Sequence, residues 1–239
     1  MPASPRSRRD TPGTPRRRRG LRGSGALAIK ALEHTGLEGS VVGIDINDGM
    51  LTIARSKSTG VKWLNARAEA LPFEEYRFDS VVSQFGLMYF ENPGLSLREM
   101  MRVLRSGGSL AVAVWDSLAN NPGFAAEENV WRQVLGGDAE DEVPFRLGDK
   151  RVLENLFDSA DIPDIGIATV SGTARFASIR AWIHTGARGW TDDEAIDDDQ
   201  LEQLLQTAER ELAGFVTPAG EVAFTTSAHI VSARRPVNL

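Results

Sequence analysis

Asp45 is the residue whose type and position point most directly to chemistry. The β-forming run 41–46 carries it, and a helix start follows at once in residues 47–51. Such a run predicts a buried strand with a carboxylate at its C-terminal tip. In open α/β sheets ligands bind beyond the carboxyl ends of the strands, where an acid accepts hydrogen bonds from ribose hydroxyls. We therefore expect Asp45 to hold a nucleotide-like cofactor. The alternative is a helix cap, for which Asn47 and Asp48 are better placed.

Two glycines, Gly23 and Gly25, precede the first predicted helix and would let the backbone approach a bound cofactor, because a side chain would collide there. A hydrophobic strand should lead into such a loop, but residues 16–22 read Arg-Arg-Arg-Arg-Gly-Leu-Arg. The spacing Gly-x-Gly-x-x-Ala, with Asp45 20 residues after Gly25, also fits a dinucleotide-binding enzyme. A plain flexible turn before the helix is the remaining alternative.

From residue 26 on, helix and strand patterns alternate, as a parallel sheet requires. The first half predicts strands over residues 41–45, 61–66, 78–83 and 110–115, helices over 26–37, 48–58 and 95–104, and a turn at 106–108. The second half predicts helices over 125–135 and 151–160 and late strands over 165–176 and 222–233. Between the late strands lies a helical insertion, residues 178–215, which we expect to cover the ligand crevice.

Composition favours one cytoplasmic domain without a metal site. Of the 239 residues 41% are hydrophobic, but no run approaches the roughly 18 apolar residues of a membrane span. The chain has no cysteine, and its three histidines, His34, His184 and His229, lack the spacing of metal ligands. Residues 1–22 carry eight arginines and one acid, so we expect a disordered basic leader followed by a domain over residues 23–239. Nucleic-acid binding by this leader is the less favoured alternative.

Three further segments follow residues 41–51 in a characteristic order along the chain. These are residues 68–73 (Ala-Glu-Ala-Leu-Pro-Phe), 78–83 (Phe-Asp-Ser-Val-Val-Ser) and 98–108 (Arg-Glu-Met-Met-Arg-Val-Leu-Arg-Ser-Gly-Gly). Together with residues 41–51 they resemble the S-adenosylmethionine-dependent methyltransferases of the Rossmann-like class, close to the type-11 and ubiquinone/menaquinone-biosynthesis group. The resemblance runs from about residue 23 to residue 115 and weakens toward the C-terminus.

This resemblance implies an α/β fold with a mostly parallel sheet, helices on both faces, and an antiparallel last strand after the helical insertion. It also implies S-adenosylmethionine as cofactor and a small molecule as methyl acceptor. The site residues that it implies are Gly23 and Gly25 at the methionyl part, Asp45 on the ribose, Ile46, Ala68 and Glu69 around the adenine, and Ser83 and Gln84 beside the reacting methyl. The acid that the family carries four residues before Gly23 falls on Arg19 in this chain.

Catalysis asks little of the protein, because the cofactor already activates the methyl group and the enzyme mainly aligns the acceptor. His184 and His229 are candidate general bases by residue type alone, and an ordinary structural histidine is the favoured alternative for each. Two other functions stay open. The arginine run 16–19 motivates a non-catalytic or truncated relative with impaired cofactor binding, and the glycine spacing motivates an NAD-dependent oxidoreductase. The acceptor and the oligomeric state do not follow from the sequence.

Overall fold

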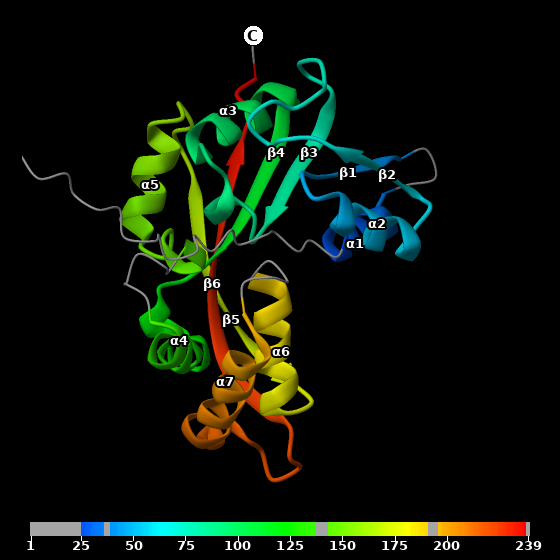
Figure 1. Cartoon of the computed structure of the whole chain (residues 1–239). Helices are drawn as coiled ribbons and strands as arrows, with labels where there is room; N and C mark the ends of the chain where they lie inside the picture. Colours follow the sequence, from blue (N-terminus) through cyan, green and yellow to red (C-terminus); the bar gives the residue numbers. More distant parts are fainter. Residues whose placement is uncertain (1–24, 36–38, 137–142, 191–195, 238–239) are drawn as a thin grey trace, which may run out of the picture.

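The computed structural model describes residues 25–35, 39–136, 143–190 and 196–237 (Figure 1). The predicted leader, residues 1–22, and the predicted site residue Gly23 lie outside the described residues. None of the helices in the described part is both long and apolar enough to cross a membrane.

Helices and strands alternate in the first half of the chain, in the order that the sequence predicts. The elements are α1 (Ala26–Glu33), β1 (Val41–Asp45), α2 (Asp48–Lys57), β2 (Val61–Asn65), β3 (Phe78–Gln84), the short 3-10 helix η1 (Leu87–Tyr89), α3 (Pro93–Val103) and β4 (Leu104–Trp115). Their starts follow from local chemistry. The side chain of Asn47 accepts a hydrogen bond from the backbone N–H of Met50 and so caps α2. Asn92 caps α3 in the same way, and Pro93 fills the first helical position.

The second half adds two long strands and the helices that follow β4. Its elements are η2 (Leu118–Asn120), α4 (Pro122–Leu135), η4 (Val143–Phe145), α5 (Lys150–Asp158), β5 (Gly166–Phe176), α6 (Ile179–Trp190), α7 (Asp198–Glu211), η5 (Ala213–Phe215) and β6 (Val222–Arg234). The described residues of the predicted insertion, 178–190 and 196–215, include α6, α7 and η5.

The strands form two groups. β1 pairs with β2 in parallel, and a four-stranded sheet has the order β3-β4-β6-β5. In this sheet β3 and β4 are parallel, and β6 runs antiparallel to both β4 and β5. The predicted antiparallel last strand is thus confirmed. In Figure 1 the β1–β2 pair lies beside β3, with β1 on the β3 side.

β1 is less buried than its sequence predicts. Of its five residues only Gly43 is buried, and the others are half-exposed. The physical reason is pairing: among the described residues, β1 is hydrogen-bonded to β2 on one edge and to no strand on the other. A strand buried on both faces needs neighbours on both edges.

The predicted turn at residues 106–108 is wrong, because these residues lie within β4. β4 begins directly after α3, and its pairing with β3 is irregular there, with Phe78 opposite Leu104 and Ser80 opposite Ser109. Gly107 has a φ of 72°, which a glycine adopts without strain. The extra residues of β4 shift its register with β3 at the amino end of the strand.

Two hydrophobic cores lie on different parts of the sheet. In the first, alternate residues of β4, Leu110, Val112 and Val114, are buried under α3 and α5. The second joins α4, α6 and α7 to the far ends of β5 and β6, around Trp182 and Phe224. The last six residue pairs of the antiparallel β5–β6 ladder, Ser171–Phe176 with Val222–Ser227, extend beyond Trp115, the last residue of β4. The second core is built on this extension, below β4 in Figure 1.

Candidate functional site

The carboxyl ends of the parallel strands meet at one edge. The carboxylate Oε1 of Glu69, in the loop after β2, accepts hydrogen bonds from the backbone N–H groups of Glu91 (3.0 Å) and Asn92 (3.3 Å). Both of these residues follow the carboxyl end of β3 through η1. Because β1 is parallel to β2 and β4 is parallel to β3, all four carboxyl ends lie on the same side. Ligands of open α/β sheets bind at such an edge.

Asp45 ends β1 at this edge. Its Oδ1 accepts a hydrogen bond from the backbone N–H of Asn47 at 2.8 Å. Burial raises the pKa of the Asp45 carboxyl, and the backbone N–H groups of Asn47 and Ile46 oppose this rise. No described residue places a cation beside it, so the carboxylate is partly desolvated without a charged partner. The helix-cap alternative does not hold for Asp45, because Asn47 caps α2.

Ile46 follows Asp45 and is 49% exposed. The family resemblance implies that this side chain contacts the adenine, and the structure keeps it out of both cores. Asn65, opposite Asp45 in the β1–β2 register, donates from Nδ2 to the carbonyl of Ile46 at 3.2 Å and to the Asp48 carboxylate at 2.8 Å. These bonds hold the loop after β1 in one conformation, with an acid and an exposed aliphatic side chain adjacent.

Gly25 forms the N-terminal boundary of α1 with a φ of 74°. A Cβ at this position would lie 2.7 Å from the ring atom Cη2 of Trp63. The need for glycine is therefore explained within the chain, by the left-handed backbone and by the packing of Trp63. A role for Gly25 in cofactor binding stays a prediction.

Ala68 and Glu69 lie in the loop after β2. Ala68 packs against the first core. The Glu69 carboxylate is engaged by the chain itself: besides the two backbone N–H groups, the Nε of Arg67 lies 3.6 Å from its Oε2. Arg67 in turn forms an ion pair with Glu91 at 2.6 Å. This loop can therefore offer a ligand its backbone groups and the methyl of Ala68 more readily than the Glu69 side chain.

The end of β3 carries backbone strain. Ser83 is half-buried and Gln84 exposed, and the next residue, Phe85, has a φ of 54°. A bulky residue in this region is an outlier, and such outliers cluster at functional sites. Phe85 is held by its backbone N–H, which donates to the carbonyl of Ala113 at 2.8 Å, and by its ring, which stacks on Trp115 at 3.9 Å. Ser83 and Gln84 thus lie at the same edge as Asp45, and their place beside the reacting methyl stays a prediction.

His229 lies in a buried polar network after β4 and is only 2% exposed. Its Nε2 lies 3.0 Å from the carbonyl of Gly148 and 3.2 Å from Oδ1 of Asp116, and its Nδ1 lies 3.0 Å from Oγ1 of Thr169. Both ring nitrogens are therefore occupied by groups of the chain. A general-base role would require one of these bonds to break, and the arrangement favours the structural alternative.

Asp116 is the polar residue at this edge that the sequence reasoning missed. It is 5% exposed, and its carboxylate accepts hydrogen bonds from Ser117 N–H (2.7 Å), Asn120 Nδ2 (3.1 Å) and Ser227 Oγ (2.7 Å). Burial acts to raise the pKa of Asp116, but these bonds and the nearby His229 outweigh it and leave the pKa lowered. The signal was present, because Asp116 directly follows an apolar strand, as Asp45 does.

The other candidate histidine, His184, is half-buried on α6. No described contact joins His184 or His229 to Asp45. Trp182, two residues earlier on α6, is buried between Phe176 and Phe224 and belongs to the second core. Among the described residues there is no group of three or more histidines and acids placed to hold a metal ion.

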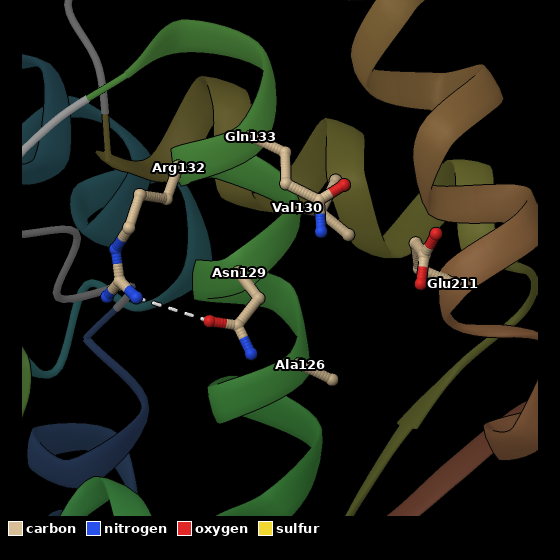
Figure 2. Close-up of a pocket in the computed structure, with 6 residues that line it drawn as sticks. All are labelled: Ala126, Asn129, Val130, Arg132, Gln133 and Glu211. Carbon is tan, nitrogen blue, oxygen red and sulfur yellow. Dashed lines mark hydrogen bonds between the residues drawn. The ribbon is translucent and has the colours of Figure 1, made fainter.

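A surface pocket lies elsewhere, between α4 and α7 (Figure 2). It is lined by Ala126, Asn129, Val130, Arg132, Gln133 and Glu211. In it, a nitrogen of the Arg132 guanidinium donates to the Asn129 side chain at 3.2 Å. None of the predicted site residues lines this pocket, so it supports no part of the cofactor site.

Solved structures share this architecture. A Bacillus halodurans protein aligns over 90% of each chain with 18% identity and a TM-score of 0.60. The YcgJ protein of Bacillus subtilis covers 90% of this chain and 89% of its own, with 16% identity and a TM-score of 0.58. Phosphoethanolamine N-methyltransferase 2 of Haemonchus contortus, solved with S-adenosylhomocysteine, covers 90% of this chain and 47% of its own, with 17% identity and a TM-score of 0.53. The predicted Rossmann-like α/β fold is confirmed.

Over the N-terminal part of the chain, sequence matches indicate a family more specifically than the structural matches do. Residues 22–112 match the family model described as a methyltransferase domain. The ubiquinone/menaquinone biosynthesis C-methyltransferase UbiE of Stenotrophomonas maltophilia is 43% identical over 96 residues, and that of a Marinomonas species is 41% identical over 96 residues. Each match covers 38% of this chain and 38% of the relative. The fold is thus that of the Rossmann-like methyltransferases. Residues 22–112 are similar to the methyltransferase domain family, which confirms the predicted resemblance.

Proposed function

We propose that this chain transfers a methyl group from S-adenosylmethionine to a small-molecule acceptor. The observation that carries the proposal is Asp45, a partly desolvated carboxylate without a described cation at the carboxyl end of β1. Ribose hydroxyls are neutral donors, and a carboxylate that accepts from them forms charge-assisted hydrogen bonds. The family match and the half-exposed Ile46 beside Asp45 support the same cofactor.

The described residues offer contacts for the adenosine part of this cofactor more fully than for its methionyl part. Asp45 would hold the ribose, and Ile46 with the backbone around Ala68 would contact the adenine. Ser83, Gln84 and the strained Phe85 would border the methionyl part and the transferred methyl. The chain before Gly25, where the family's glycine-rich loop belongs, lies outside the described residues.

When bound, S-adenosylmethionine supplies an activated methyl on a positively charged sulfur, which a nucleophilic acceptor atom takes by in-line displacement. The task of the protein is then alignment and the exclusion of water. The stack of Phe85 on Trp115 makes a rigid apolar wall at the edge where the acceptor would enter. His229 orders the loop after β4 through Asp116 and Gly148, and we assign it no proton transfer.

The helical cluster beyond β4 is the part that we propose to select the acceptor. The β5–β6 extension places α6 and α7 past the carboxyl end of β4, on the side of the proposed cofactor site. This position supports the expectation that residues 178–215 cover the crevice. We propose a cytoplasmic small molecule as the acceptor. Because the matched relatives are covered over only 38% of their length, their acceptor is not transferred to this chain.

Titration calorimetry with S-adenosylmethionine, S-adenosylhomocysteine and NAD tests the proposal. We expect both sulfur compounds to bind and NAD to give no heat of binding. Binding of NAD alone would support the oxidoreductase, which the family match does not favour. A folded chain that binds none of the three would support the alternative of a relative with impaired cofactor binding. A methylation assay over a panel of small acceptors then tests transfer itself.

A further inference from the structure

Arg146 carries a positive charge that no carboxylate in the described part of the chain pairs with. It lies between η4 and α5, and its side chain is exposed. Its Nη2 donates to the backbone carbonyl of Phe90 at 3.0 Å, the one hydrogen bond that joins this guanidinium to the described residues. Desolvation lowers the pKa of Arg146, and no described carboxylate opposes this shift. A guanidinium has five N–H donors, so most of them remain available to a ligand.

The segment on either side of Arg146 is fixed by packing. Phe145 and Leu147 are both buried, and Leu147 belongs to the first core. Gly148 packs tightly against the loop after β4, because a Cβ on it would lie 2.3 Å from the backbone nitrogen of Ser117. The backbone that carries Arg146 is therefore held in place, and a group on a fixed backbone loses less conformational entropy when it binds a ligand.

Phe90 brings this cation to the proposed site. The short helix η1 carries the chain from the strained Phe85 to Phe90. A Cβ on Gly86 would lie 3.3 Å from the ring atom Cζ of Phe90 and 3.1 Å from Oγ of Ser83. The Phe90 ring is thus folded back over Gly86, beside the hydroxyl group at the end of β3. Because Arg146 is bonded to the carbonyl of this same Phe90, its charge lies close to the edge where Ser83 would border the transferred methyl.

Three acids at this edge are engaged by other groups. Glu91 forms an ion pair with Arg67 at 2.6 Å. Glu69 is held by two backbone N–H groups, and Asp116 accepts three hydrogen bonds within its own network. None of the three neutralises Arg146. A cation that is partly withdrawn from water without an anionic partner is unfavourable, and a ligand with the opposite charge would relieve this cost.

We propose that Arg146 binds an anionic group, a carboxylate or a phosphate, of the methyl acceptor. This assignment rests on the proposed function, since it adds a residue that recognises the acceptor of that reaction. The N–H donors of a guanidinium lie in one plane and match two oxygens of a single anion. The acceptor is then an organic anion, with its charged group held at Arg146 and its nucleophilic atom facing the cofactor.

Binding of small aromatic anions tests this assignment without catalysis. Benzoate, phenyl phosphate and the neutral benzamide are titrated into the full chain, and binding is followed by saturation-transfer NMR. The variants are Arg146→Gln and, as a matched control, Arg98→Gln. Arg98 is also an exposed arginine that donates to a backbone carbonyl, that of Ser159 at 3.1 Å, but it lies on α3. We expect at least one anion to bind more tightly than benzamide. Arg146→Gln should weaken that binding about tenfold or more, and Arg98→Gln should leave it unchanged.

Each result has a definite meaning. Tighter binding of benzoate points to a carboxylate on the acceptor, and tighter binding of phenyl phosphate points to a phosphate. No anion binding, equal binding of benzamide, or equal anion affinity in Arg146→Gln and the unmodified chain would overturn the proposal. Arg146→Lys, which keeps the charge, should retain part of the affinity, and melting curves check that each variant is folded.

A parallel titration with S-adenosylhomocysteine separates this proposal from the proposed function. We expect Arg146→Gln to bind S-adenosylhomocysteine as the unmodified chain does, because Arg146 is assigned to the acceptor and not to the cofactor. If the unmodified chain bound no S-adenosylhomocysteine, the proposed function would fail. The anion titrations would still decide whether Arg146 is an anion site, since they need neither cofactor nor methyl transfer.

Discussion

Replacing Asp45 with asparagine should separate cofactor affinity from stability. In the structure the Asp45 carboxylate is partly desolvated and lacks a described cation, so its negative charge costs folding free energy at neutral pH. Asparagine keeps the same shape and still accepts the hydrogen bond that Asn47 N–H now donates to Oδ1. We therefore expect Asp45→Asn to melt at the same or a slightly higher temperature at pH 7.

The pH dependence follows from the sign of the shift. The pKa of Asp45 is raised in the folded state, so the folded chain binds this proton more readily than the unfolded chain. The cost of its charge is complete above the folded pKa and disappears as the pH falls below the ordinary value of 3.8. Any stability gained by Asp45→Asn at pH 7 should therefore vanish at pH 3, which paired melting curves would show.

Affinity should change in the opposite direction. Two charge-assisted bonds to ribose hydroxyls at about 1.5 kcal/mol each give about 3 kcal/mol, and one neutral bond that asparagine retains gives about 1 kcal/mol. The difference of about 2 kcal/mol corresponds to roughly 30-fold weaker binding of S-adenosylmethionine by calorimetry. Asp79→Asn is the control, because Asp79 lies at the opposite, amino end of β3. Native affinity in Asp45→Asn would refute the ribose assignment.

Three further predictions concern stability and use thermal or urea unfolding. Asp116→Ala should cost roughly 2–5 kcal/mol, since it leaves Ser227 and His229 buried without their partner; a loss below 1 kcal/mol would show that this network is dispensable. Because the pKa of Asp116 is lowered, its contribution should be complete above pH 3.8 and fall away as the pH drops toward the folded pKa, whereas Asp116→Ala should lack this acid-dependent loss. Phe224→Ala should cost about 3–5 kcal/mol, because Phe224 is 5% exposed and contacts four aromatic rings; the exposed Val237→Ala should cost almost nothing.

Local sequence pattern predicted most helices and strands, because each type of element has its own spacing of apolar residues. β1, β2 and β3 lie where the sequence put them within one residue. The predicted start of β4 was wrong, since two glycines suggested a turn where the structure has a strand with a register shift. Strand order could be expected only through the family resemblance, because pairing is set by contacts between distant residues.

The candidate site was predictable where one residue carries the signal and not where several share it. Asp45 stood out because a strand and a helix start flank it. Asp116 has the same local setting, but its partners Ser227 and His229 lie more than 100 positions later, so no local pattern could reveal the network. The bonds that engage Glu69 depend on backbone N–H groups of Glu91 and Asn92, which a sequence does not distinguish from any others.

Because β5 and β6 extend beyond β4, two separate hydrophobic cores pack on the same pair of strands. The first core includes Val81 of β3, the strand that ends at Gln84, and the second, around Trp182 and Phe224, joins α4, α6 and α7 to the far ends of β5 and β6. Residues on α6 and α7 can therefore be exchanged without repacking the first core, whereas Phe124 of α4 contacts Trp115, which packs against that core. A two-stranded ribbon twists more readily than a wide sheet. Small changes in strand twist along Ser171–Phe176 would therefore change the angle between the helical cluster and the edge of the sheet. Under the proposed function, a change in the angle of this helical cluster is a route to new acceptors, besides a change in the residues that line a pocket.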